Sequence, residues 1–402
     1  MDIQRATIYG LVCLLAVITV VHIAKSVAAA VVYLDNNGTT QIFPESLDVM
    51  NYVYRNYYGN ASALYSLGSQ SKQLLEKCRE KMASMLNCKA SEIFFTSGAT
   101  ESNNIAIRGV FSKHKDKGKH VIMTSIEHPS VDETVKTLDG ADVTVLEVDK
   151  YGVLNLDHLR NAIRKDTVLV TVIMGNNEIG TLQDIKAMAA LCRAQGVHFH
   201  CDMTQVIGKY IVNFTELDVD SATGSGHKFH GPKASGFMYL RKGLDKFDSC
   251  MSGGHQEKNV RSGTENIPGI VSMCYSLALC HRYIQSGKAQ KIKEMRDWMK
   301  NELIRRIPGT IVNGHPTYTL YNTLSLCVPV NSRKLLMALD KRRIYVNTGS
   351  ACSQGASSRV LDAIGVPIET QDGSIRISLG FMTTWSESVK AVNNIVDLCR
   401  NK

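Results

Sequence analysis

The stretch Gly224-Ser225-Gly226-His227-Lys228-Phe229-His230-Gly231-Pro232-Lys233 places one lysine between a histidine and a Gly-Pro turn. The glycines on both sides allow the backbone to approach a ligand closely. A lysine amine can form an imine with an aldehyde, and burial turns it into a base or nucleophile. Most lysines are solvated surface residues, so the stretch alone favours that simpler interpretation. The rest of the chain reverses the balance.

The composition is that of a globular protein. The chain has 402 residues, of which 44% are hydrophobic and 21% are charged, which is enough for a large core and two domains. The net charge of +9 is spread along the chain and is not interleaved with aromatic residues, so nucleic-acid binding is not expected. The 11 cysteines form no CxxC pair, which argues against a metal site and favours reduced thiols in a reducing compartment.

Residues 1–30 contain an apolar segment. Residues 6–24 are about long enough to span a bilayer, with Arg5 and Lys25 on either side. A cleaved signal peptide or a buried helix are the alternatives. We predict a single-pass N-terminal membrane anchor, with the catalytic part of the protein in the cytosol.

From Val31 onward, segments with the apolar spacing of strands alternate with segments that have the apolar spacing of helices. Strands are expected at 31–35, 93–96, 120–125, 143–148, 168–174, 197–202, 237–240, 323–328 and 375–378. Helices are expected at 45–57, 68–86, 97–108, 156–163, 184–195 and from about 267. The alternation predicts an α/β fold with a mostly parallel sheet. We divide it into a large domain (31–266, with 31–45 packing on the second unit) and a smaller C-terminal α/β domain with its linking helix (267–402).

Two turns of this sheet suggest a cofactor site. Gly98, Ala99 and Thr100 begin a helix after a strand, where backbone N–H groups and a hydroxyl suit a phosphate. A simple N-cap is the alternative. Asp202 ends a strand one βα unit before Lys228, and a carboxylate there can keep a pyridinium nitrogen protonated, although it can also cap the next element. Together, an acid facing a ring nitrogen and a lysine facing an aldehyde are what pyridoxal phosphate needs.

Four further residues carry suggestive chemistry. His128 follows a strand and can stack on a planar ring or carry protons, and Asn177 can donate to a ring oxygen or a carboxylate. Cys352 lies in a small flexible loop from which a thiol can reach a substrate. Arg376 alternates with apolar residues in a strand and suits bidentate carboxylate binding. Each has a simpler alternative, which is a surface, turn or structural role.

In this order, the motifs resemble the cysteine desulfurases of the NifS/IscS type, in the class V aminotransferase group. The matching stretches are YLDNNGTT (33–40), TSGATESNN (96–104), EHPSV (127–131), NNEIGTLQDI (176–185), HCDMTQVIGK (200–209), GSGHKFHGPKASG (224–236), RSGTENIPGIV (261–271), GSAC (349–352) and SIRISLG (374–380). They cover residues 31 to 402, and so many ordered matches make the resemblance specific. It implies the type I fold of pyridoxal phosphate enzymes and a homodimer.

The resemblance also implies roles for individual residues. Lys228 holds the cofactor aldehyde, Asp202 pairs with the ring nitrogen, Gln205 with the ring hydroxyl, and His128 stacks on the ring and moves protons. Gly98, Ala99, Thr100, Ser225 and His227 hold the phosphate, and Thr264 reaches in from the second subunit. Asn177 and Arg376 hold the substrate carboxylate. Cys352 takes sulfur from L-cysteine as a persulfide, leaves L-alanine and passes the sulfur to an acceptor protein, for iron–sulfur cluster assembly or thiolation.

The sequence departs from the family pattern in two loops. Where the family commonly has Asn-Pro-Ser-Ser and a nearby histidine, this chain has Asn60-Ala61-Ser62-Ala63 and Tyr65. The segment after Cys352 is short, which predicts less reach and slower or differently partnered delivery of sulfur. The alternatives are a selenocysteine lyase, another lyase or aminotransferase of the same fold, and an inactive membrane-bound interaction protein.

Overall fold

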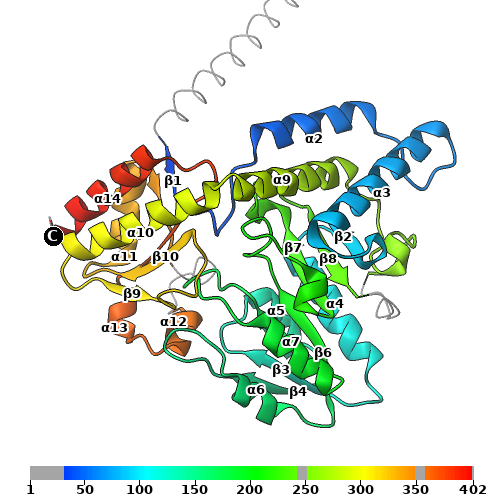
Figure 1. The fold of residues 1–402 in the computed structure, drawn as a ribbon, viewed down its shortest axis with the longest axis horizontal. Helices are drawn as coiled ribbons and strands as arrows, with labels where there is room; N and C mark the ends of the chain where they lie inside the picture. The colour runs from blue at the N-terminus through cyan, green and yellow to red at the C-terminus, as the bar shows by residue number, and fades with distance from the viewer. Residues whose placement is uncertain (1–30, 242–250, 349–357, 401–402) are drawn as a thin grey trace, which may run out of the picture.

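The computed structural model describes residues 31–241, 251–348 and 358–400 (Figure 1). The strands are β1 (Val32–Tyr33), β2 (Ile93–Thr96), β3 (His120–Thr124), β4 (Asp142–Leu146), β5 (Thr167–Ile173), β6 (His198–Asp202), β7 (Ser221–Ser225), β8 (Gly236–Leu240), β9 (Ile311–Asn313), β10 (Thr323–Cys327), β11 (Ile344–Tyr345) and β12 (Ser374–Ser378). The helices are α2 (Pro44–Asn56), α3 (Ser66–Leu86), α4 (Ala99–Lys113), α5 (Pro129–Lys136), α6 (Leu156–Ala162), α7 (Ile185–Ala194), α8 (Phe214–Leu217), α9 (Ile267–Gln285), α10 (Lys288–Arg306), α11 (Ser332–Lys341), α12 (Arg359–Ala363), α13 (Ile368–Gln371) and α14 (Trp385–Arg400).

The large unit is built on a seven-stranded sheet in the order β2-β8-β7-β6-β5-β3-β4. The strands from β7 to β4 pair in parallel, and β8 runs antiparallel to both of its neighbours. Helices cover both faces. On β5, Val170 packs into the cluster that contains Met188 of α7, whereas Leu169 packs into the cluster that contains Ile107 of α4. This confirms the α/β fold with a mostly parallel sheet.

The smaller unit has an antiparallel sheet in the order β12-β10-β9, with α10, α11 and α14 beside it (Figure 1). The first described strand belongs to this unit, because β1 pairs in parallel with β11 and Asp35 bridges to Ser378. Immediately afterwards Thr40 N–H donates to the His227 carbonyl at 2.8 Å. Residues 36–40 therefore connect the small unit to the lysine turn. The proposed division of the chain at residue 267 stays a prediction.

We correct the prediction of a transmembrane anchor. In the three described segments, no helix is long and apolar enough to cross a bilayer. The apolar stretch 6–24, on which the prediction depended, lies outside the described residues. The structure therefore gives no support to a membrane anchor or to a membrane localisation, and we withdraw both.

A buried ion pair ties α3 to the segment that precedes α9. Arg79 donates two hydrogen bonds of 2.7 Å to the Glu257 carboxylate, and both side chains are at most 5% exposed. Arg79 also pairs with Glu76 at 3.2 Å, but the Glu76 side chain is 49% exposed.

Glu257→Gln is expected to lower the free energy of unfolding by about 3 to 5 kcal/mol, because it removes the only buried counter-charge described for Arg79 and leaves the half-exposed Glu76 alone to compensate it. Glu76→Gln, the matched control, is expected to cost at most about 1 kcal/mol, since water screens its exposed pair. Urea unfolding of both variants measures the difference. Equal losses would contradict the assignment of Glu257 as the partner that compensates Arg79.

Candidate active site

A cavity of about 430 Å³ opens where β3, β5, β6 and β7 end. Parallel α/β sheets bind ligands at these carboxyl ends, and the volume lies in the range of small-molecule sites. The cavity lining includes these residues predicted from the sequence: Gly98, Ala99, Thr100, His128, Asn177, Asp202, Gln205, Ser225, His227 and Lys228. The structure thus brings together residues that are up to 130 positions apart in the chain, from Gly98 to Lys228.

One end of the cavity is suited to an anion. The 15-residue helix α4 begins at Ala99, and the amides of its first turn have no partner within the helix. The backbone of Gly98 is closely covered, because a Cβ at Gly236 would lie 2.5 Å from its Cα. Burial and the nearby charges of Lys228 and Lys233 lower the pKa of His227 to about 4. An entering phosphate would meet helix amides and two lysine charges here.

Asp202 lies at the end of β6 with only 2% of its surface exposed. One carboxylate oxygen accepts from the Thr204 amide at 2.9 Å, and the other accepts from the Asn103 side chain at 3.0 Å. Both carboxylate oxygens therefore have a hydrogen-bond donor. A buried carboxylate of this kind can stabilise a cation in the cavity.

His128 is the N-cap of α5, and its Nδ1 accepts from the Ser130 amide at 3.1 Å. The Ser130 hydroxyl lies 2.8 Å from the same nitrogen. Burial lowers the pKa of His128, and the charge of Asp202 opposes this effect. With Nδ1 accepting, the neutral ring carries its proton on Nε2.

Lys228 follows β7 in a 3₁₀ turn, Gly226–Lys228. Its Nζ donates to the carbonyls of Asn37 and Gly38, each at 2.7 Å. Gln205 donates from its amide to the same Asn37 carbonyl at 3.0 Å. The segment that follows β1 therefore binds both Lys228 and Gln205 through the Asn37 carbonyl.

Lys209 places a buried amine behind the cavity. Its Nζ donates to the Gln205 side-chain oxygen at 2.6 Å, and it is 6% exposed. Burial, followed by the charges of Lys228 and Arg376, holds the pKa of Lys209 well below its usual range. Because the Gln205 oxygen is taken by Lys209, only its NH₂ group is left to donate toward the cavity.

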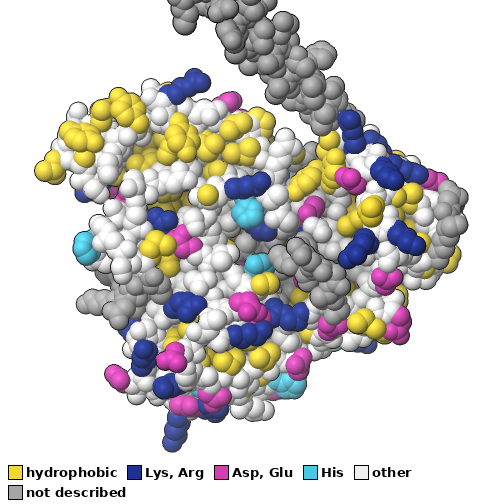
Figure 2. All heavy atoms as spheres, turned by 180° about the vertical axis from the view of Figure 1, so that it is seen from behind, with side chains coloured by type: hydrophobic (Ala, Val, Ile, Leu, Met, Phe, Trp, Pro, Cys, Tyr) yellow, Lys and Arg dark blue, Asp and Glu magenta, His cyan; other side chains and the backbone are white. Residues whose placement is uncertain are grey.

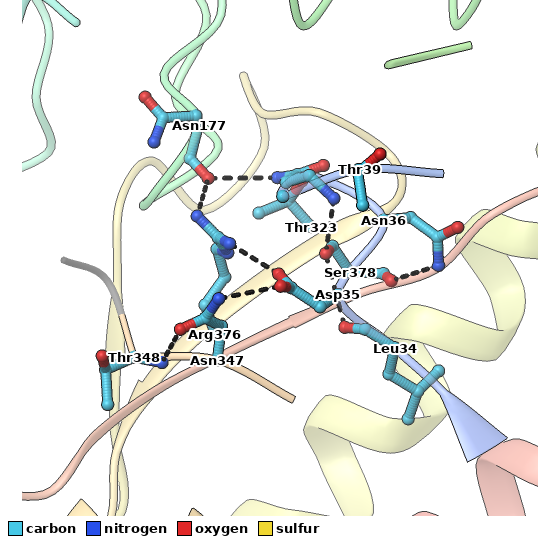
Figure 3. A network of polar contacts seen from close by, with 12 residues as sticks. Leu34, Asp35, Asn36, Thr39, Asn177, Thr323, Asn347, Thr348, Arg376 and Ser378 are labelled. Atoms are coloured by element: carbon cyan, nitrogen blue, oxygen red, sulfur yellow. Dashed lines mark hydrogen bonds and ion pairs between the residues drawn. The ribbon is translucent and has the colours of Figure 1, made fainter. Parts of the chain in front are cut away.

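Arg376 does not line the cavity, but it contacts Asn177, which does. Its guanidinium donates to Asp35 at 2.6 Å and to the Asn177 carbonyl at 3.1 Å, and the residue is 2% exposed. Its Nε has no hydrogen-bond partner among the described residues. Figure 3 shows the Asn177 side chain directed away from this network. In this conformation Asp35 neutralises the arginine that was predicted to bind a substrate carboxylate.

Besides Arg376, two further predicted residues are not placed in the cavity. Cys352 lies outside the described residues, in the gap between Thr348 and Ser358. The first described residues after the gap lie close to the site. The Ser358 hydroxyl donates to Glu178, next to Asn177, at 2.6 Å, and Arg359 pairs with Asp132 of α5. Thr264 is exposed and does not line the cavity of its own chain.

The sequence analysis missed several partners of these residues. Lys209 lies four residues after Gln205 within HCDMTQVIGK. This spacing could have indicated a contact between the two side chains. Asp35 and Asn37 belong to a quoted motif, but nothing in the local sequence indicates that they meet Arg376 and Lys228. Such contacts depend on how distant segments pack.

Glu127 gives the site a pH-dependent stability. Its carboxyl group is 1% exposed, one oxygen accepts from Thr124 and the Ile173 amide, and the other has no described partner. Burial raises the pKa of Glu127 from its usual 4.5 to about 8. The folded protein therefore retains a proton that the unfolded chain releases between these two pH values. This carboxyl group lowers stability progressively as the pH rises through that window.

Glu127→Gln is expected to gain stability relative to the parent as the pH rises from 5 to 8, by at most about 1.4 kcal/mol per pH unit. Chemical unfolding of both proteins at several pH values measures the change, and any constant offset from repacking cancels. The exposed Glu133→Gln serves as the control and is expected to give a flat difference. A flat difference for Glu127→Gln would contradict a neutral buried carboxyl.

Comparisons with known proteins agree with this geometry. Residues 32–392 match the family profile described as aminotransferase class-V. The chain is 42% identical over 370 residues to the cysteine desulfurase IscS of Methanosarcina thermophila, covering 91% of each chain. It is 39% identical to the cysteine desulfurase IscS of Dictyoglomus turgidum, covering 88% of this chain and 90% of the relative.

Solved structures show the same similarity. A NifS-like protein superposes with a TM-score of 0.87 at 34% identity, over 92% of this chain and all of the other. SspA in complex with cysteine superposes with a TM-score of 0.77 at 28% identity, over 88% of this chain and 99% of that one. These findings confirm the predicted family. The chain belongs to the class V aminotransferase family, among the cysteine desulfurases of the NifS/IscS type.

Proposed function

We propose that the protein is a pyridoxal phosphate-dependent cysteine desulfurase, which converts L-cysteine to L-alanine and retains the sulfur as a persulfide on Cys352. The observation that carries the proposal is the joint presence of Lys228, the buried Asp202 and the amides that begin α4 in one cavity. These are an amine, an acid and an anion site, and pyridoxal phosphate offers an aldehyde, a ring nitrogen and a phosphate. The family relatives that carry this activity by name support it further.

The residues fit the cofactor. The Gly98–Thr100 turn, Ser225 and His227 would hold the phosphate, and Asp202 would hold the ring nitrogen. Gln205 would donate to the ring hydroxyl, because Lys209 occupies its oxygen. When bound, the cofactor supplies an electron sink for bonds at the substrate α-carbon.

The chain's own groups would then handle protons. Lys228 would take the proton from the α-carbon, since its amine is within reach of the same cavity. His128, neutral near pH 7 because burial lowers its pKa, would stack on the ring with its Nε2 proton available. The Asp202 carboxylate would balance the positive ring nitrogen.

Substrate and sulfur would be handled at the side of the cavity next to Arg376. Asn177 and Arg376 would hold the substrate carboxylate, and for this the guanidinium would use its unpaired Nε or exchange Asp35 for the substrate. The Cys352 thiolate would attack the substrate sulfur. The new S–S bond forms as the carbon–sulfur bond breaks, the electron pair stays on the substrate carbon, and that carbon is protonated to give alanine. A thiol of an acceptor protein or a reductant would then remove the outer sulfur.

A homodimer would complete the site through Thr264 of the second subunit. Figure 2 shows apolar side chains gathered over the part of the molecule that contains α2 and α3. The exposed apolar side chains of this region include Tyr52, Tyr54, Tyr58, Leu64, Tyr65 and Tyr275. Such a patch is typical of a surface that a partner covers. Light scattering is expected to give twice the chain mass of 44.3 kDa.

The direct test supplies the purified chain with pyridoxal phosphate, L-cysteine and a reductant. Alanine and sulfide should appear in equal amounts without any keto acid. Alanine that requires a keto acid would indicate an aminotransferase instead. A much faster turnover of selenocysteine with little release from cysteine would indicate a selenocysteine lyase.

A further inference from the structure

A line of buried hydrogen-bonding side chains leads away from Asp202 along one face of the sheet. His198, His200 and Asp202 alternate on β6, so they point to the same face. On β7, Ser221 lies opposite His200, and Thr223 lies opposite Asp202. All five side chains are at most 7% exposed. A polar line at this depth requires complete pairing.

Asn103 of α4 joins this line to Asp202. Its amide nitrogen donates to the Asp202 carboxylate at 3.0 Å and to the Ser130 hydroxyl at 2.9 Å. Since an ionised carboxylate only accepts, the NH₂ group must face Asp202. The Asn103 oxygen then accepts from the Thr223 hydroxyl and the His200 ring, each at 3.0 Å.

These partners fix the direction of the whole line. His200 must donate from Nε2 to Asn103, so its Nδ1 accepts from the Ser221 hydroxyl at 2.8 Å. Ser221, having used its proton, accepts from Nε2 of His198 at 2.8 Å. Burial lowers the pKa of His200 to about 4, which agrees with a neutral ring that donates once and accepts once. Every donor in the line points toward Asp202.

A second arm reaches the other side of the cofactor site. Because the Ser130 hydroxyl accepts from Asn103, its proton is directed to Nδ1 of His128. One asparagine therefore connects the carboxylate expected at the ring nitrogen with the histidine expected on the ring face. Asn103 is itself completely buried and contributes no atom to the cavity lining.

We propose that Asn103 is a positioning residue that ends a one-directional hydrogen-bond relay, from His198 through Ser221 and His200, and thereby keeps the Asp202 carboxylate oriented toward the cavity. The proposal rests on the proposed function, since it assigns Asp202 to the cofactor ring nitrogen. Aligned donors stabilise negative charge in a low-dielectric interior more than a single bond does. Without Asn103, the carboxylate would lose a donor that stabilises its negative charge and would draw the ring proton away from the nitrogen.

The titratable groups that face Asp202 are His128 and Glu127 from the β3–α5 connection, His200 from β6, and Lys228 beyond β7. An Asn103→Ala substitution leaves all of them in place. Lys228 would be joined to the cofactor through its side-chain nitrogen. A positive charge on the ring nitrogen lowers the proton affinity of that lysine nitrogen. When Asp202 draws the proton away, the ring nitrogen is less positive, and the absorbance titration of the bound cofactor shifts to higher pH.

The test is this absorbance titration on the full-length, cofactor-loaded protein. Asn103→Ala is expected to raise the pH midpoint by about one unit, the size expected for a lost hydrogen bond to a charged group. Asn104→Ala, the neighbouring asparagine whose side chain bonds Thr100 and Arg108 at the helix surface, is the matched control and should keep the parental midpoint. An unchanged midpoint in Asn103→Ala would overturn the proposal.

His200 provides a second route in case Asn103→Ala does not fold. His200→Ala is expected to raise the midpoint by less than Asn103→Ala does, and His200→Gln, which restores a donor, is expected to return it toward the parental value. Equal midpoints for the alanine and glutamine variants would contradict a relay.

Nitrogen-15 spectra of histidine-labelled protein provide a readout that needs neither cofactor nor turnover. The relay requires His200 to be neutral, with its proton on Nε2. A proton on Nδ1 would refute the direction of the relay. A protein that shows the predicted His200 signal but takes up no cofactor would instead contradict the proposed function.

Discussion

Replacement of Lys228 by alanine is expected to abolish the release of alanine and sulfide from cysteine, with a loss of at least about 10³-fold in kcat. Lys228 is the amine proposed both to hold the cofactor and to remove the α-proton, and no other lysine that lines the cavity lies beside Asn37 and Gly38. Product formation by the two purified proteins measures the effect.

Two controls make the Lys228→Ala result specific. The variant should retain its fold. The two backbone carbonyls that accept from Lys228 in the parent lie at the edge of a water-accessible cavity, so water can take the place of the lysine amine. Circular dichroism tests this. Lys186→Ala removes an exposed lysine of α7 and should keep the parental rate. If the Lys228→Ala protein retained a tenth of the parental rate, Lys228 would not be the group that removes the α-proton.

Asp202→Asn is expected to have the second largest effect, with a fall of about 10² to 10⁴-fold in kcat. The substitution keeps the volume but removes the buried charge that would keep a ring nitrogen protonated. It also places two amides face to face, since Asn103 donates to this position. Steady-state kinetics of the loaded variant measure the fall.

The matched control for Asp202 is Asp218→Asn, which alters an exposed carboxylate that pairs with Arg193 and Arg241. It should leave kcat unchanged and reduce stability slightly. If Asp202→Asn kept kcat within about threefold, then the buried carboxylate would not be the partner of the ring nitrogen.

Long apolar strands and motif turns were predictable because they depend on local pattern. β5 reads TVLVTVI and is buried along its whole length, as a parallel central strand requires. β7, in contrast, reads SATGS and was not predicted. Only Thr223 among its five residues is β-branched, and the strand exists because β6 and β8 pair with it on either side.

The long helical region after residue 267 shows how one residue divides an element. α9 and α10 are separate helices, and Gly287 between them has φ of +79°, a conformation that glycine adopts easily. The sequence analysis predicted a helix there but not its division. The order of the strands and the antiparallel β8 were not predictable from periodicity, since pairing depends on contacts between distant segments.

In the candidate site, the residues of the motif turns were predictable, but their supporting partners were not. Asp202 and Lys228 were identified by chemistry and spacing. Asn103 and Lys209 are within quoted motifs, yet their importance depends on burial and on which atoms they face, which the sequence does not give. The ion pair of Arg376 with Asp35 joins the two ends of the chain and has no local signature. The roles of all the predicted site residues, Cys352 and Thr264 among them, stay predictions.

The most direct test of the account is the mass of the peptide that contains Cys352, measured after the cofactor-loaded protein has reacted with L-cysteine in the absence of a reductant. We predict the addition of one sulfur atom to Cys352, removed by a thiol reductant and absent from Cys352→Ser, together with one alanine per sulfur. Alanine formed while Cys352 stays unmodified, or sulfur bound to another cysteine instead, would contradict the proposed persulfide mechanism.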